Sequence, residues 1–166
     1  MKLNLRVLFI LFWFLISISE RVSAQIVINE FMSDNTTAIV DQDGDFSDWI
    51  ELYNTSSTPI NLLNFSLSDQ HDELNKWSFP EIIIPAHSFL LIFASNKNIS
   101  DTGELHTNFK ISSSGEPLFL SNNLGQIINQ IGPIELIENK SYGRSPDGSD
   151  NLTCYHCIFW LNYSLD

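Results

Sequence analysis

The stretch DQDGDFSDWIELYN, residues 41–54, joins a turn rich in aspartate and glycine to a run of alternating side chains. Asp and Gly favour turns because they accept turn backbone conformations and hydrogen-bond locally. After the turn, Trp49, Glu51 and Tyr53 fall on one face of an extended chain, and the aliphatic residues between them fall on the other. This alternation predicts a loop followed by a β-strand over residues 48–54.

The same pattern of short runs rich in β-branched and aromatic residues recurs on both sides of this stretch. The predicted strands are residues 26–31, 48–54, 60–68, 76–80, 88–95, 106–111, 117–121 and 126–131. The separators are turn sequences rich in Gly, Pro, Asn and Ser, such as NNLG, which predicts a hairpin between the last two strands. Short strands at this spacing, with no helical apolar period among them, predict an all-β sandwich or barrel.

Residues 1–24 differ from the rest of the chain. Lys2 and Arg6 form a basic start, residues 7–19 are an apolar core, and small residues lead to Ala24. This order predicts a secretory signal peptide cleaved after Ala24. The apolar core is shorter than the ~20 residues of a transmembrane helix, which favours cleavage over the alternative of an uncleaved anchor. We therefore expect a secreted or cell-surface protein without membrane insertion after cleavage.

The remaining chain is strongly acidic. The full sequence carries a formal net charge of −12, and the leader contributes +2 through three cations and Glu20, so residues 25–166 carry −14. Nucleic-acid binding depends on clustered Lys and Arg, and attraction to anionic membranes does too. The five scattered cations of the mature chain disfavour both kinds of binding. The charge suits cationic partners or divalent cations.

Three aspartates in the opening stretch, Asp41, Asp43 and Asp45, are the candidate metal ligands. An EF-hand loop starting at Asp41 would need glycine where Phe46 stands and glutamate where Leu52 stands, so that motif is excluded. Two interpretations remain. The three hard carboxylates form a looser Ca²⁺ site, or they belong to a solvated turn whose aspartates bond nearby backbone N–H groups.

Other residue patterns that could carry catalysis are weak. Asp48 and Glu51 should face opposite sides of their strand, which is wrong for an acid–base pair acting on one bond. GRSPDG, residues 143–148, has one residue too many for a nucleophile elbow. The four histidines lack metal-ligand spacing, although a Ser–His–Asp set assembled by the fold stays open. No catalytic residue and no cofactor is expected, apart from the candidate Ca²⁺.

Cys154 and Cys157 enclose His156 in the sequence CYHC. A zinc site would need a second ligand pair, and a redox C-x-x-C would need a thioredoxin-like helix. In an oxidising compartment we expect either a small local disulfide or an accidental pair.

Six motifs in order resemble the lamin tail domain, in the form found in secreted bacterial and archaeal proteins. They are IVINEFMSDNTT, DGDFSDWIELYN, INLLNFSLSD, KWSFP…IIIPAHSFLLIFAS, LHTNFKISSSGEPLFLSN and SYGRSPDGS. The resemblance implies an immunoglobulin-like β-sandwich over residues 25–150. It also implies structural roles for the recurring positions Asn29, Glu30, Asp48, Trp49, Glu51, Leu52 and Asn54.

The sequence departs from this family at two places. The family usually has glycine where His87 stands, and residues 151–166 replace the expected final strand with an atypical tail. A frameshift or early stop in a longer gene would produce such an ending.

The resemblance implies a non-catalytic secreted module that binds or tethers an extracellular or cell-envelope protein or another surface component. The alternative is a metal-dependent secreted hydrolase, or a fragment of a larger secreted enzyme.

Overall fold

The computed structural model describes residues 25–100 and 103–156. The predicted signal peptide and Cys157 lie outside the described residues. The strands in chain order are β1 (Ile26–Met32), β2 (Asp48–Asn54), β3 (Ile60–Asn61), β4 (Ser66–Ser68), β5 (Trp77–Ser78), β6 (Ile83–Ile84), β7 (Phe89–Ala94), β8 (Leu105–His106), β9 (Leu118–Ser121), β10 (Ile127–Ile131), β11 (Lys140–Arg144) and β12 (Leu152–His156). Among the residues described, no helix has the length and apolar character needed to cross a membrane.

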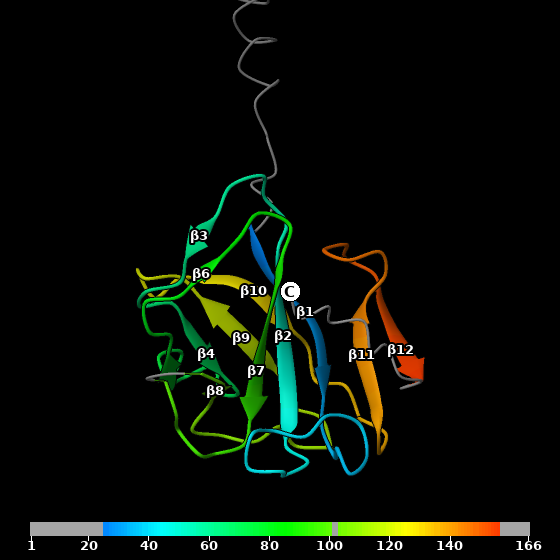
Figure 1. The fold of residues 1–166 in the computed structure, drawn as a ribbon. Helices are drawn as coiled ribbons and strands as arrows, with labels where there is room; N and C mark the ends of the chain where they lie inside the picture. The colour runs from blue at the N-terminus through cyan, green and yellow to red at the C-terminus, as the bar shows by residue number, and fades with distance from the viewer. Residues whose placement is uncertain (1–24, 101–102, 157–166) are drawn as a thin grey trace, which may run out of the picture.

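The strands form two main sheets that pack face to face (Figure 1). The larger sheet has six strands in the order β12-β11-β1-β2-β7-β8, and the smaller has four in the order β10-β9-β4-β5. A short β3–β6 ladder completes the fold, and every pairing between named strands is antiparallel except β7 with β8. The predicted all-β class and immunoglobulin-like sandwich are confirmed.

Strand β2 lies at the centre of the larger sheet, as its alternating sequence requires. It pairs with β1 on one side and with β7 on the other, so Ile50 lies opposite Phe31 and Ile92. Ile50 and Leu52 are fully buried between the sheets. Complete burial of one such side chain contributes roughly 1.5–3 kcal/mol, so this face of β2 contributes strongly to the core.

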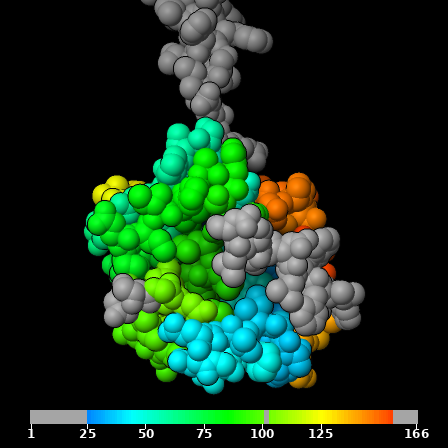
Figure 2. Space-filling model, viewed as in Figure 1, coloured from blue at the N-terminus to red at the C-terminus, as the bar shows by residue number. Residues whose placement is uncertain are grey.

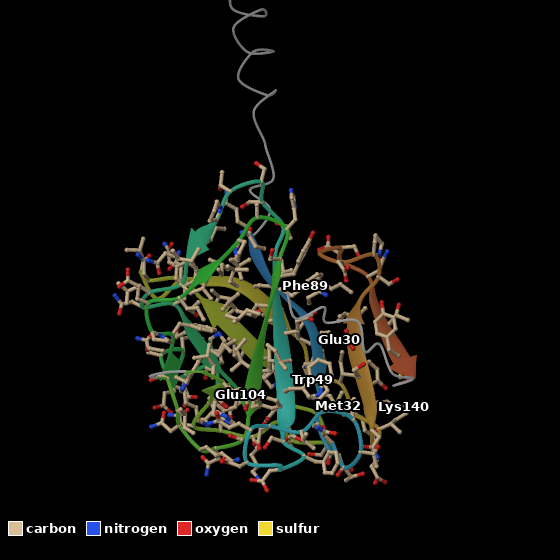
Figure 3. The ribbon with its side chains drawn as sticks, viewed as in Figure 1. Glu30, Met32, Trp49, Phe89, Glu104 and Lys140 are labelled. Carbon is tan, nitrogen blue, oxygen red and sulfur yellow. The ribbon has the colours of Figure 1, made fainter. Side chains whose placement is uncertain are left out.

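The opposite face of the six-stranded sheet carries a second, smaller apolar cluster. Trp49, Met32 and Phe93 pack together there. Figure 3 shows Met32 and Trp49 on neighbouring strands, with Glu30 close by on the same sheet. Each face of this sheet therefore carries an apolar cluster that includes a residue of β2.

The loop between β1 and β2 packs against this second cluster through Ala38, and it forms the lower surface in Figure 2 (blue to cyan). Asn35 closes it, because its buried side-chain amide donates to the carbonyls of Ile39 at 2.7 Å and Ser47 at 2.8 Å. This closure places the aspartate turn directly before β2.

Turns follow the expected chemistry at most places where the chain reverses. The β9–β10 hairpin forms around NNLG, with Gly125 at φ +72°. His87, at the family's glycine position, has φ +53°, in the left-handed region that favours glycine.

Two strands, β11 and β12, do not follow from the sequence pattern. β6 lies where IIIPAHSFLLIF predicts a strand before Pro85, but the hairpin with β7 that this sequence predicts is wrong, because β6 pairs with β3. β11 contains Gly143 and buried Arg144, and it becomes a strand because it pairs with β1. β12 lies within residues 151–166, where the sequence predicts an atypical tail in place of a final strand. It is nevertheless a strand, and it pairs with β11 over its full length. The six-stranded sheet thus continues past Asp150.

Candidate functional site

The three candidate metal ligands converge, as the calcium interpretation requires, but a lysine lies between them. Carboxylate oxygens of Asp41, Asp43 and Asp45 all fall within 4.8 Å of one another. The Nζ of Lys97 lies 2.7 Å from Asp41 Oδ2, 2.7 Å from Asp43 Oδ2 and 2.9 Å from Asp45 Oδ2. The ammonium of Lys97 therefore takes the position that a cation would occupy.

Asp41 also holds the turn together. Its Oδ1 accepts the backbone N–H groups of Asp43 and Asp45, each at 3.0 Å, and its Oδ2 accepts the Ser47 hydroxyl at 3.0 Å. Its side chain is fully buried. Burial by itself raises the pKa of Asp41, but the hydrogen bonds from Lys97, the turn and Ser47 outweigh burial and lower the pKa to about 2.

Lys97 responds in the opposite direction. Desolvation lowers its pKa, but the three aspartates more than compensate and raise the pKa above its ordinary value. Asp41 and Lys97 are thus both held in their charged forms. A Ca²⁺ ion needs six to eight oxygens and would have to displace this ammonium, so calcium binding here stays a prediction.

A second group of carboxylates lies on the outer face of the six-stranded sheet. A bulge at Asn29 shifts the β1–β2 register so that Glu30 lies directly opposite Glu51. Buried Asn29 donates to Glu51 Oε1 at 3.1 Å and to Asp147 Oδ1 at 3.0 Å, and it accepts the Gly148 N–H at 3.0 Å. One amide therefore ties β1, β2 and the loop after β11 together.

The electrostatics of this second group favour protonation. Burial raises the pKa of Glu51 to about 7. The hydrogen bond from Asn29 lowers this pKa, and the nearby carboxylates of Glu30 and Asp147 raise it further. Burial likewise raises the pKa of Glu30, which accepts a short hydrogen bond from the Ser141 hydroxyl. Within residues 25–100 and 103–156, no Lys or Arg forms an ion pair with either glutamate.

A serine and a histidine also meet, although their geometry does not suit catalysis. Ser95 Oγ lies 2.9 Å from His106 Nδ1, and Glu104 Oε2 lies 3.8 Å from His106 Nε2. The His106 side chain is completely buried and stacks on Phe93. A substrate cannot reach this imidazole, so the pair is structural.

Asp48 and Glu51 do not share a site. Asp48 Oδ2 accepts the backbone N–H of Ile111, a core residue, while Glu51 lies in the outer carboxylate group. The expectation that they face opposite sides of β2 is confirmed.

An open groove of about 510 Å³ runs along one edge of the four-stranded sheet. Its lining consists of residues 127–132 together with Arg144, Asp150 and Leu152. The Arg144 guanidinium is 6% exposed; its Nε donates to the Ile28 carbonyl at 2.8 Å and its Nη2 donates to Asn129 Oδ1 at 3.3 Å. Its Nη1 donates to the carbonyl of Ser149.

Sequence reasoning found the aspartates but missed their partner and the other sites. Lys97 is 52 to 56 positions away from the three aspartates, so no local motif contains it. One signal was present, because a mature chain with five cations and 19 acids makes each lysine a candidate partner for an acidic turn. The groove had no such signal, since it is formed by strands distant in sequence.

Comparison with known proteins identifies the family to which the chain belongs. No curated protein matches it. The lamin tail domain family matches residues 19–135, which is more than half of the chain and includes the first ten strands. The resemblance inferred from the six motifs is confirmed, and the chain belongs to the lamin tail domain family.

Proposed function

We propose that this protein is a secreted, non-catalytic module that binds or tethers an extracellular or cell-envelope protein. The groove beside β10 carries this proposal, because it combines a strand edge that no described strand pairs with, a buried cation and apolar side chains. Binding sites are typically concave, and this groove is concave with a lining of both polar and apolar groups. Membership in a family of immunoglobulin-like modules supports a binding role.

The chemistry of the candidate catalytic groups supports a non-catalytic role. Lys97 forms an ion pair with each aspartate of the turn, and the Ser95–His106 pair is buried. A metal-dependent hydrolase would require the three aspartates to exchange Lys97 for a metal ion. Within the described residues no observation favours that alternative over binding.

Secretion is tested by expressing the full chain and measuring the intact mass of the exported protein. We expect loss of residues 1–24 and recovery outside the cell. An exported protein that keeps these residues would show an uncleaved anchor, and a protein confined to the cytoplasm would contradict the proposed location.

Binding is tested with residues 25–166, labelled and titrated onto washed cell-envelope fractions. We expect saturable binding that unlabelled protein displaces, and cross-linking from a photoreactive residue at position 130 in β10. The control variant carries the photoreactive residue in place of exposed Leu63, which does not line the groove. Binding that never saturates would contradict a specific binding module.

A further inference from the structure

We infer that the groove beside β10 takes an extended peptide as an added strand, with a carboxylate side chain of that peptide bound to Arg144. This inference rests on the proposed binding function and names the chemistry of the partner. Three features of the groove carry it: a free strand edge, an unequal sandwich and a buried cation.

The first feature is the edge itself. β10 is the last strand of the four-stranded sheet, and no strand in the described part of the chain pairs with its other side. Its sequence, IINQI, contains no charge and no proline. Edge strands are normally protected by such residues or by bulges. β10 has an irregularity between Ile127 and Asn129, so the part of its edge that is open to strand addition is residues 129–131.

The second feature is the unequal width of the two sheets. β10 packs near β1, where Asn129 Oδ1 accepts the Ile28 N–H at 3.0 Å, while β11 and β12 continue the larger sheet beyond β1. In Figure 1, β11 and β12 stand at the right, apart from the strands of the smaller sheet. The groove lies between β10 and this extension, where one more strand at a spacing of ~4.8 Å would complete the smaller sheet.

The third feature is the charge at the groove, where the buried cation Arg144 differs from the acidic chain as a whole, whose net charge favours cationic partners. Arg144 is nearly buried, and its only ion-pair partner within the described residues is Asp150, at 3.9 Å and fully exposed. Burial lowers the pKa of Arg144, which means that its charge is poorly solvated where it lies. An incoming carboxylate would replace the distant Asp150 with a direct, charge-assisted hydrogen bond.

The apolar part of a largely polar lining suits the side chains beside that carboxylate. Leu152 is 37% exposed, and Ile127 and Ile128 are partly exposed on β10. Successive side chains of an added strand alternate, so one face of the peptide would meet these residues while the other faces solvent. We therefore expect a β-branched peptide with one acidic residue to bind best.

The test uses two peptides of about seven residues, long enough to pair with all of β10, with blocked termini so that a side chain supplies the only charge. Both alternate threonine and valine; one has a central glutamate and the other a glutamine. We expect residues 25–166 to bind the glutamate peptide about tenfold more tightly, since hydrogen bonds to charged groups are the stronger class. The amides of residues 127–131 should shift and gain protection from hydrogen exchange.

Matched substitutions locate the site. Leu152→Glu places a like charge in the groove and should weaken the glutamate peptide about tenfold or more. Leu124→Glu makes the same change at a residue that is 76% exposed and outside the groove, and should leave affinity unchanged. Arg144→Lys keeps the charge but loses the guanidinium fork, so it should reduce the preference for glutamate in protein whose amide spectrum stays folded.

The inference would be overturned if neither peptide binds, or if both bind with equal affinity. It would also be overturned if the shifts of the amide signals are confined to residues outside the groove. Self-association of the protein in sedimentation experiments, with a second copy occupying β10, would overturn it as well. Saturable envelope binding that survives Leu152→Glu would overturn this inference and leave the proposed function standing. Tight binding of the glutamate peptide without any binding to the envelope would support this inference and contradict the proposed function.

Discussion

At position 87 the chain turns between β6 and β7 with a histidine at φ +53°. A side chain with a Cβ atom pays roughly 1–2 kcal/mol for this conformation, and glycine does not. We expect His87→Gly to raise the free energy of unfolding by about 1 kcal/mol, part of the gain being lost to the freer unfolded chain. Urea denaturation measures this change.

His71 is the control for that substitution, because it is also an exposed histidine but does not have a positive φ. Its ring packs edge-on against Phe119 at 5.5 Å between ring centroids. His71→Gly should therefore lower stability. If both substitutions lower it equally, position 87 is not strained.

Lys97 is the second residue whose role can be measured directly. Lys97→Met leaves buried Asp41 without its cation, and breaking such a pair costs about 3 kcal/mol. Asp41 has a pKa of about 2, so its stabilisation is present above pH 3.8 and is lost as pH falls towards 2. In Lys97→Met we expect acid unfolding to begin at higher pH, as followed by circular dichroism.

The same variant tests the calcium prediction. With the ammonium gone, the three carboxylates are free to bind a divalent ion, and millimolar Ca²⁺ should raise the melting temperature of Lys97→Met. The native chain should shift much less, because the ion must first displace Lys97. Matched ionic strength in NaCl is the control, and an equal calcium shift in both proteins would show that Lys97 does not compete.

At the scale of elements, the β1–β2 ladder places two glutamates opposite one another. The folded pKa of Glu51, about 7, lies above the ordinary 4.5, so the folded state binds more protons and loses stability as pH rises from 4.5 to 7. Glu51→Gln mimics the protonated side chain. We expect it to reduce the stability loss between pH 5 and pH 8 by on the order of 2 kcal/mol, as measured by urea denaturation at each pH.

Exposed Glu73 is the matched control for this substitution, since it lies away from the β1–β2 ladder. Glu73→Gln should leave the pH profile of stability unchanged. A Glu51→Gln profile parallel to that of the native chain would show that Glu51 is ionised throughout this range.

At the scale of the whole molecule, the net charge of −14 on residues 25–166 opposes folding through self-repulsion. Salt screens charges separated by more than ~10 Å at 0.1 M. We expect the melting temperature at pH 8 to rise by a few degrees between 20 and 300 mM NaCl, since for a chain of this length 1 kcal/mol corresponds to roughly 2–4 °C. KCl is the control, because screening by either salt should raise the melting temperature equally. A fall in melting temperature with added salt would mean that the ion pairs of Lys97 stabilise the fold more than the net repulsion destabilises it.

How far the sequence predicts the structure differs between the fold and the sites. Strand β2 could be predicted because alternation of Ile50 and Leu52 with Trp49 is a local property with a period of two. β11 could not be predicted, because its small and polar residues are extended only through pairing with β1. The sequence also does not distinguish buried Asn54, whose side-chain amide donates to three backbone carbonyls, from exposed Asn64.

The sequence by itself determined the all-β class, the central strand, the acidic character and the family, because local periodicity, turn residues and motif order carry that information. Only the tertiary structure decided what the aspartate turn binds, which carboxylates face each other and where a strand edge is left open. Those features join residues separated by tens of positions, such as Asp41 with Lys97 and Glu30 with Glu51. Their distances depend on sheet register and on the bulge at Asn29, which no local pattern specifies.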